Sequence, residues 1–230
     1  MRIHVTAEFK SWVQTQSEIV LKVAVVGGSS RDPEVVYLSE FFPDTEIFYF
    51  GIDNSHDDPR FSYLDLNSKN PNDLPAFDLV ISSQVLEHIW NLSNAFDCLA
   101  RMTKPGRFLW INCPASNMPH GSPHYFSAGY TDEFISKNLE MRNFETLIHK
   151  VIGSKRNYFA THALRYWFTE KELMRPVTGY NFQPGSFLGV SKKFLLDLPG
   201  RFVSLFYSNV VTNNIEYATE SLVLAKLKES

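Results

Sequence analysis

Residues 76–88 read Ala-Phe-Asp-Leu-Val-Ile-Ser-Ser-Gln-Val-Leu-Glu-His, and this stretch decides the fold. A short run from Phe77 to Ile81, apolar except for Asp78, stops at two serines, and a helix-like segment follows them. A short apolar run that ends abruptly is typical of a buried parallel strand. Open α/β sheets bind ligands beyond the carboxyl ends of their strands, so Ser82 and Ser83 are predicted to face a cleft.

On both sides of this stretch, short apolar runs alternate with helical patterns, as in βαβ units with a parallel sheet. The predicted strands are residues 21–26, 46–52, 61–66, 77–82, 108–113, 144–152 and 220–227. The predicted helices are residues 8–20, 33–42, 92–103 and 131–138. We therefore predict an α/β, Rossmann-like fold with seven strands, mostly parallel, and helices on both faces of the sheet.

The length of the chain suits one domain that spans residues 1–230, because two full domains would be cramped in 230 residues. Residues 154–219, between the sixth and seventh predicted strands, are rich in aromatic side chains. This segment is predicted to be an insertion or lid over an acceptor pocket. Burial in the core or in the surface of a homodimer is the alternative use of so many aromatic residues.

Composition disfavours several classes of partner. The net charge is −3 and no block of basic residues occurs, so a nucleic-acid partner is not expected. No apolar run reaches the roughly 18 to 20 residues that span a bilayer, and the first residues lack the apolar segment of a signal peptide. A cytoplasmic location without a disulfide between Cys98 and Cys113 is the default expectation.

Two features predict a nucleotide-type ligand at the carboxyl edge of the sheet. Gly27-Gly28-Ser29 follows the first strand, where glycine lets the backbone approach a ligand closely, although a plain tight turn is the alternative. Asp53 follows the second strand, where a carboxylate can accept hydrogen bonds from both ribose hydroxyls. The alternative for Asp53 is an ordinary turn. Both NAD-binding and S-adenosylmethionine (SAM)-binding folds use such an acid.

Two motifs resemble class I SAM-dependent methyltransferases of type 11/12. Residues 77–88 resemble the phrase FDLV-x-x-x-x-VLEH of that family, and residues 99–109 resemble its h-x-R-h-L-K-P-G-G-x-h segment. Val25 departs from the family, which often has an acidic residue there. The Tyr-x-x-x-Lys pair of short-chain NAD enzymes and the G-x-x-x-x-G-K-[ST] phosphate loop are both missing from the sequence. For SAM, the resemblance implies contacts from Gly27, Gly28, Ser29, Asp53, Asn54, Asp65, Leu66, Ser82 and Ser83.

Three histidines are candidate catalytic residues. His120 and His124 lie in a loop rich in Pro and Gly beyond the fifth strand, and His88 follows the fourth. Imidazole titrates near neutral pH, so each could accept a proton from a hydroxyl or amine. Hydrogen bonding to the backbone is the alternative role for His120 and His124, and bracing the loop after the fourth strand is the alternative for His88. The loop cannot form the regular helix that metal binding by two histidines four residues apart requires, so no metal is predicted.

The sequence therefore predicts a SAM-dependent methyltransferase acting on a hydroxyl or amine of a small molecule, a sugar or another metabolite. The alternative is a non-catalytic protein of the same fold that serves in binding or assembly. The departure at Val25 supports this alternative.

Overall fold

The structure is a computed structural model that describes residues 2–16, 22–53, 58–68, 73–117, 124–159, 162 and 215–229. Its strands are β1 (Lys22–Val26), β2 (Glu46–Gly51), β3 (Phe61–Tyr63), β4 (Phe77–Ser83), β5 (Thr103–Pro114), β6 (Phe144–Gly153) and β7 (Ala218–Leu227). Its helices are α1 (Arg2–Thr15), α2 (Pro33–Phe41), α3 (Leu92–Met102), α4 (Asp132–Glu140) and α5 (Lys155–Phe159), with 3₁₀ turns η1 (Leu86–His88) and η3 (Ile215–Tyr217).

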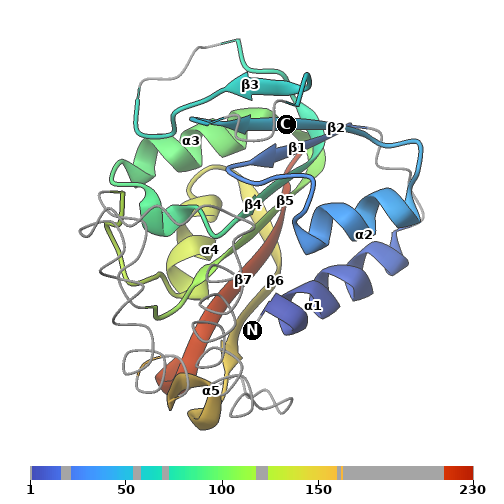
Figure 1. The fold of residues 1–230 in the computed structure, drawn as a ribbon. Helices are drawn as coiled ribbons and strands as arrows, with labels where there is room; N and C mark the ends of the chain where they lie inside the picture. Colours follow the sequence, from blue (N-terminus) through green and yellow to red (C-terminus); the bar gives the residue numbers. More distant parts are fainter. Residues whose placement is uncertain are drawn as a thin grey trace, which may run out of the picture.

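All seven strands form one sheet in the order β3-β2-β1-β4-β5-β7-β6 (Figure 1). Pairing is parallel from β3 through β5, and β7 runs antiparallel between β5 and β6. The predicted α/β fold with a mostly parallel, seven-stranded sheet is thereby confirmed. Because β1 to β5 point the same way, their carboxyl ends share one edge, where such sheets bind ligands.

Successive side chains of a strand point to opposite faces of the sheet, and a hydrophobic core lies on each face. In β1, Val23 and Val25 pack with residues of α1 and α2, whereas Ala24 and Val26 pack with residues of α3 and α4. Figure 1 shows these two helix pairs on opposite sides of the sheet. A strand buried on both faces reads as a continuous apolar run, which explains the sequence of β1. The predicted placement of helices on both faces is confirmed.

Some boundaries differ from the prediction. Helix α1 begins at Arg2 and ends at Thr15, earlier than expected at both ends. Strand β3 ends at Tyr63, because the next residues turn inward and bury Leu64 and Leu66. Strand β5 starts at Thr103, directly after α3, and includes Pro105-Gly106. Its pairing with β4 changes register between Phe77 and Leu79.

Most of the aromatic segment 154–219 lies outside the described residues, so its predicted role as an insertion or lid stays a prediction. Both cysteines are buried and free, as expected, and burial raises the pKa of the Cys98 thiol to about 11. None of the helices in the described ranges is long and apolar enough to cross a membrane.

Candidate functional site

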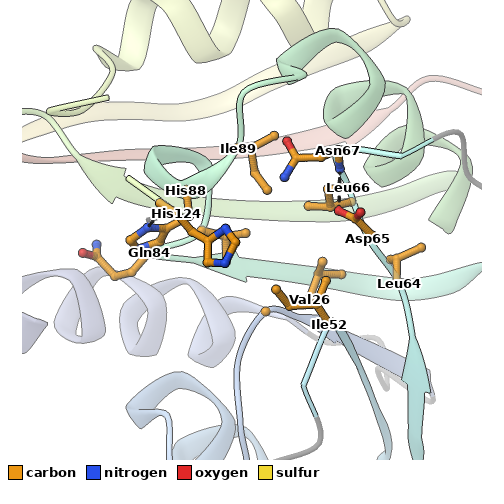
Figure 2. Close-up of a pocket in the computed structure, with 13 residues that line it drawn as sticks. Val26, Ile52, Leu64, Asp65, Leu66, Asn67, Gln84, His88, Ile89 and His124 are labelled. Atoms are coloured by element: carbon orange, nitrogen blue, oxygen red, sulfur yellow. Dashed lines mark hydrogen bonds between the residues drawn. The ribbon is translucent and has the colours of Figure 1, made fainter. Parts of the chain in front are cut away.

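Two adjoining cavities lie at the carboxyl ends of β1 to β4. The first has a volume of about 240 Å³ and lies toward the end of β3 (Figure 2). The second has a volume of about 340 Å³ and lies toward the start of α2. The residues that line both cavities are Gly27, Gly51, Ile52 and Gln84. One elongated ligand could therefore occupy both cavities across these four residues.

The glycine turn after β1 needs residues without a side chain. Gly27 has a φ of +72°, and a Cβ there would lie 2.6 Å from Cγ2 of Val85. Its N–H donates to the carbonyl oxygen of Phe50 at the end of β2, over 2.7 Å. A Cβ on Gly28 would collide with the carboxylate of Asp32, which accepts the N–H of Ser29. The turn thus exposes backbone to the cavities, and its contact with a ligand stays a prediction.

The end of β2 presents an apolar and an acidic side chain next to each other. Asp53 is exposed and lines the second cavity. Ile52, which no sequence pattern marks as a site residue, lines both cavities and is 58% exposed. An exposed isoleucine beside a carboxylate suits a ligand with a flat apolar part and hydroxyl groups. Asn54 lies outside the described residues.

After β3, Asp65 has a structural role as well as a place in the first cavity. Its carboxylate accepts the N–H of Asn67 over 2.9 Å and the hydroxyl of Ser68 over 2.6 Å. These bonds shape the turn that brings Asp65, Leu66 and Asn67 to the wall of the first cavity. Leu66 is also part of the core beneath that wall. Both predicted residues therefore lie where a ligand could touch them.

The two serines at the end of β4 do not share one role. Ser83 lines the second cavity, and its buried hydroxyl has no hydrogen-bond partner among the described residues. Ser82 is fully buried and lines neither cavity, contrary to the prediction. Neighbouring strand residues point to opposite faces of the sheet, so only one of the two can face this cavity.

His88 and His124 both line the first cavity (Figure 2). Nδ1 of His88 lies 2.6 Å from the main-chain oxygen of His124. A carbonyl oxygen only accepts hydrogen bonds, so His88 carries a proton on Nδ1 and anchors the loop that bears His124. Nε2 of His88 lies 3.8 Å from Oε1 of Glu87, a fully buried carboxylate. His120 lies outside the described residues.

In the described part of the chain, no group of three or more His, Cys, Asp or Glu residues is arranged to hold a metal ion. The arrangement at the sheet edge instead offers exposed backbone, apolar walls, a carboxylate at the end of β2 and two imidazoles.

Comparisons with known proteins find similarity to methyltransferases. Residues 53–111 match a family described as Methyltransferase domain, and no curated protein matches the chain by sequence. A putative sarcosine dimethylglycine methyltransferase from Galdieria sulphuraria has a similar structure, with a TM-score of 0.59 and 11% identity over 98% of this chain and 86% of that one.

Two further solved structures with a similar fold are named for two different activities. The O-methyltransferase of a trans-AT PKS multienzyme from Brevibacillus brevis, in complex with S-adenosyl-L-homocysteine (SAH), has a TM-score of 0.59 and 14% identity over 97% of this chain and 72% of that one. The [4+2]-cyclase SpnF has a TM-score of 0.57 and 15% identity over 99% of this chain and 81% of that one. Residues 53–111 thus match a methyltransferase domain, and the sheet has the class I, Rossmann-like fold of solved methyltransferases, one of them in complex with SAH.

Proposed function

We propose that the protein transfers a methyl group from SAM to a hydroxyl or amine of a small molecule, and that SAM lies across the two cavities. The observation that carries the proposal is that the two cavities share Gly27, Gly51, Ile52 and Gln84 in their walls, and two of these residues have no side chain. The first cavity is walled by Leu64, Leu66 and Ile89, an apolar lining that suits a purine. The second offers the carboxylate of Asp53 for a ribose and the hydroxyl of Ser83 for the methionine part.

Methyl transfer from a sulfonium is a displacement that depends mainly on alignment of the acceptor with the methyl group. The residues of this chain supply that alignment and a destination for the proton of the acceptor. His124 lines the first cavity and is held by His88 through its main-chain oxygen. We assign His124 as the proton acceptor and His88 as the residue that positions it. A role for His120 stays a prediction.

Two acceptor chemistries are supported as candidates by the comparisons. One protein with a similar structure is named an O-methyltransferase, and another is named as a putative methyltransferase of sarcosine and dimethylglycine, which are amines. Both kinds of acceptor therefore belong in the first panel of compounds to be tested.

The direct test is to measure SAM and SAH binding by isothermal titration calorimetry, followed by methyl transfer to a panel of hydroxyl and amine metabolites. Binding together with transfer to a member of the panel supports the proposal. Tight binding of SAM without transfer to any member would favour the non-catalytic alternative. Size-exclusion chromatography of the same preparation tests the predicted homodimer.

Replacing Asp53 by alanine is expected to weaken SAM binding by about 1.5–3 kcal/mol, or roughly 10- to 150-fold in Kd, because two charge-assisted hydrogen bonds to the ribose are lost. Calorimetric titration measures the change. Asp44→Ala removes an exposed carboxylate from the turn between α2 and β2 and serves as the control of equal charge. Unchanged affinity in folded Asp53→Ala protein would remove Asp53 from the site.

Replacing Gly27 by alanine is expected to cost about 1–2 kcal/mol of stability, because an L-residue is strained at a φ of +72°. The added methyl also meets Val85 at the boundary between the cavities, so SAM affinity should fall by about tenfold or more. Gly106→Ala is a matched control, because Gly106 has a φ of +73° but lines neither cavity. Equal SAM affinity in the two variants would place the glycine turn away from the cofactor.

A further inference from the structure

Gln84, at the end of β4, has an unusual backbone conformation. Its φ is +59°, and Asn143 is the other non-glycine residue with a positive φ in the described part of the chain. Glutamine has no side-chain geometry that favours this region, and the strain costs on the order of 1–2 kcal/mol. Such a conformation persists only where its surroundings impose it, and it occurs often at functional sites.

The surroundings of Gln84 impose its conformation through bonds to two other strands. The N–H of Gln84 donates to the main-chain oxygen of Asn112 on β5 over 2.7 Å. The side-chain nitrogen Nε2 donates to Oδ1 of Asn112 and to Oε2 of Glu220 on β7, over 2.8 Å each. Asn112 in turn donates to the same oxygen of Glu220 over 3.3 Å and to the main-chain oxygen of Ser221 over 3.1 Å.

The three side chains form a network that is largely closed to water. Asn112 is 1% exposed and Glu220 is 4% exposed. In a medium of low dielectric constant, hydrogen bonds to a carboxylate are strong and a lost partner is costly. Both N–H groups of the Gln84 amide are used by this network. Figure 2 shows the amide directed away from Leu64 and Asp65 across the first cavity.

Gln84 stands where the two cavities meet, and it directs the chain that follows. It lines both cavities, and the next residue, Val85, lies against Gly27. The turn η1 then begins, and it carries His88 into the first cavity. A change in the backbone of Gln84 would therefore move the wall of both cavities at once.

We propose that Gln84 is a positioning residue for the cofactor, and that Asn112 and Glu220 act through it by locking the end of β4 against β5 and β7. The inference rests on the proposed placement of SAM across the two cavities. Neither Asn112 nor Glu220 lines a described cavity, so their effect on the cofactor passes through Gln84.

The first test separates the backbone of Gln84 from its side chain. Gln84→Gly removes the side-chain bonds but leaves a residue that adopts a positive φ without strain, so the fold should be retained. SAM affinity is expected to fall by about tenfold or more, because the end of β4 loses its side-chain bonds to β5 and β7 and keeps only the main-chain bond to Asn112. Asn143→Gly is the matched control at a φ of +66°, and it should bind SAM like the wild type.

The second test is a reciprocal exchange. Gln84→Glu faces Glu220 with a second carboxylate and should lower SAM affinity by about tenfold or more. In Gln84→Glu combined with Glu220→Gln, one amide again meets one carboxylate. The amide of Asn112 carries both a donor and an acceptor, so it can hydrogen-bond to the amide and the carboxylate whichever of positions 84 and 220 holds each. The double variant is expected to recover most of the affinity, and Glu220→Gln alone should stay within a few-fold of the wild type.

Two results would overturn the inference: folded Gln84→Gly that binds SAM like the wild type, or a double variant that binds no better than Gln84→Glu. Circular dichroism and thermal unfolding of each variant show whether affinity changes without loss of the fold. A wild-type protein that binds no SAM would contradict the proposed function instead, so the two failures are distinguishable.

Discussion

Replacing His124 by alanine is expected to lower kcat for methyl transfer by about 10²- to 10⁴-fold, the usual contribution of a general base. The side chain lines the first cavity, and its loop is anchored by the hydrogen bond from His88. Turnover at saturating SAM should fall far more than SAM affinity, because the proposed base takes the proton of the acceptor, although His124 also borders the cavity proposed for the purine. The measurement is turnover across pH with an acceptor from the panel, together with calorimetric SAM binding.

His149→Ala provides the matched control for His124. His149 is exposed on β6, bonded to Asp132, and lines neither cavity, so its loss should leave turnover near the wild-type value. His124→Ala should also lose the limb of the pH–rate profile that reports the imidazole. If turnover stays within a few-fold and both limbs remain, the proton leaves by another route and alignment alone drives the reaction.

Replacing Glu220 by glutamine is expected to stabilise the protein above pH 7. Burial raises the pKa of the Glu220 carboxyl from 4.5 to about 7, against the hydrogen bonds from Gln84 and Asn112 that lower it. The folded state therefore holds a proton that the unfolded chain releases, and stability falls as pH rises from about 4.5 to about 7. At 1.36 kcal/mol per unit, this shift corresponds to a loss of about 3 kcal/mol, which the neutral amide avoids.

Denaturant unfolding of wild type and Glu220→Gln at pH 5 and pH 8 measures this effect. The advantage of the variant should be large at pH 8 and small at pH 5. Glu145→Gln changes an exposed carboxyl on β6 and should show no comparable dependence on pH. An equal difference between wild type and Glu220→Gln at both pH values would show that Glu220 titrates in the folded protein as it does in the unfolded chain.

The elements that the sequence predicted well are those with local causes. Strand β4 is buried along its whole length, so its apolar run could be recognised without knowledge of its neighbours. Gly27 follows β1 directly and Asp53 lies two residues after β2, and the parallel sheet brings the ends of those strands together. The prediction of a cleft at this edge followed from the direction of the strands alone.

The features that were missed depend on distant parts of the chain. Gln84 lies 136 residues before Glu220 and 28 before Asn112, and no local sequence pattern predicts the hydrogen bonds between their side chains. Ile52 read as the last residue of an apolar strand, and only the fold shows it exposed between two cavities. The assignment of both Ser82 and Ser83 to the cleft overlooked the alternation of β4, which turns them to opposite faces.

The place of β7 in the sheet has a consequence for how the protein folds. This strand follows all the others in the sequence, yet it lies between β5 and β6 and bonds to both along its length. During synthesis on the ribosome, the edges of β5 and β6 that pair with β7 stay unpaired until residues 218–227 emerge. The contact from Glu220 to Gln84 forms in that same last step, so the end of β4 is fixed to β7 only when the sheet is complete.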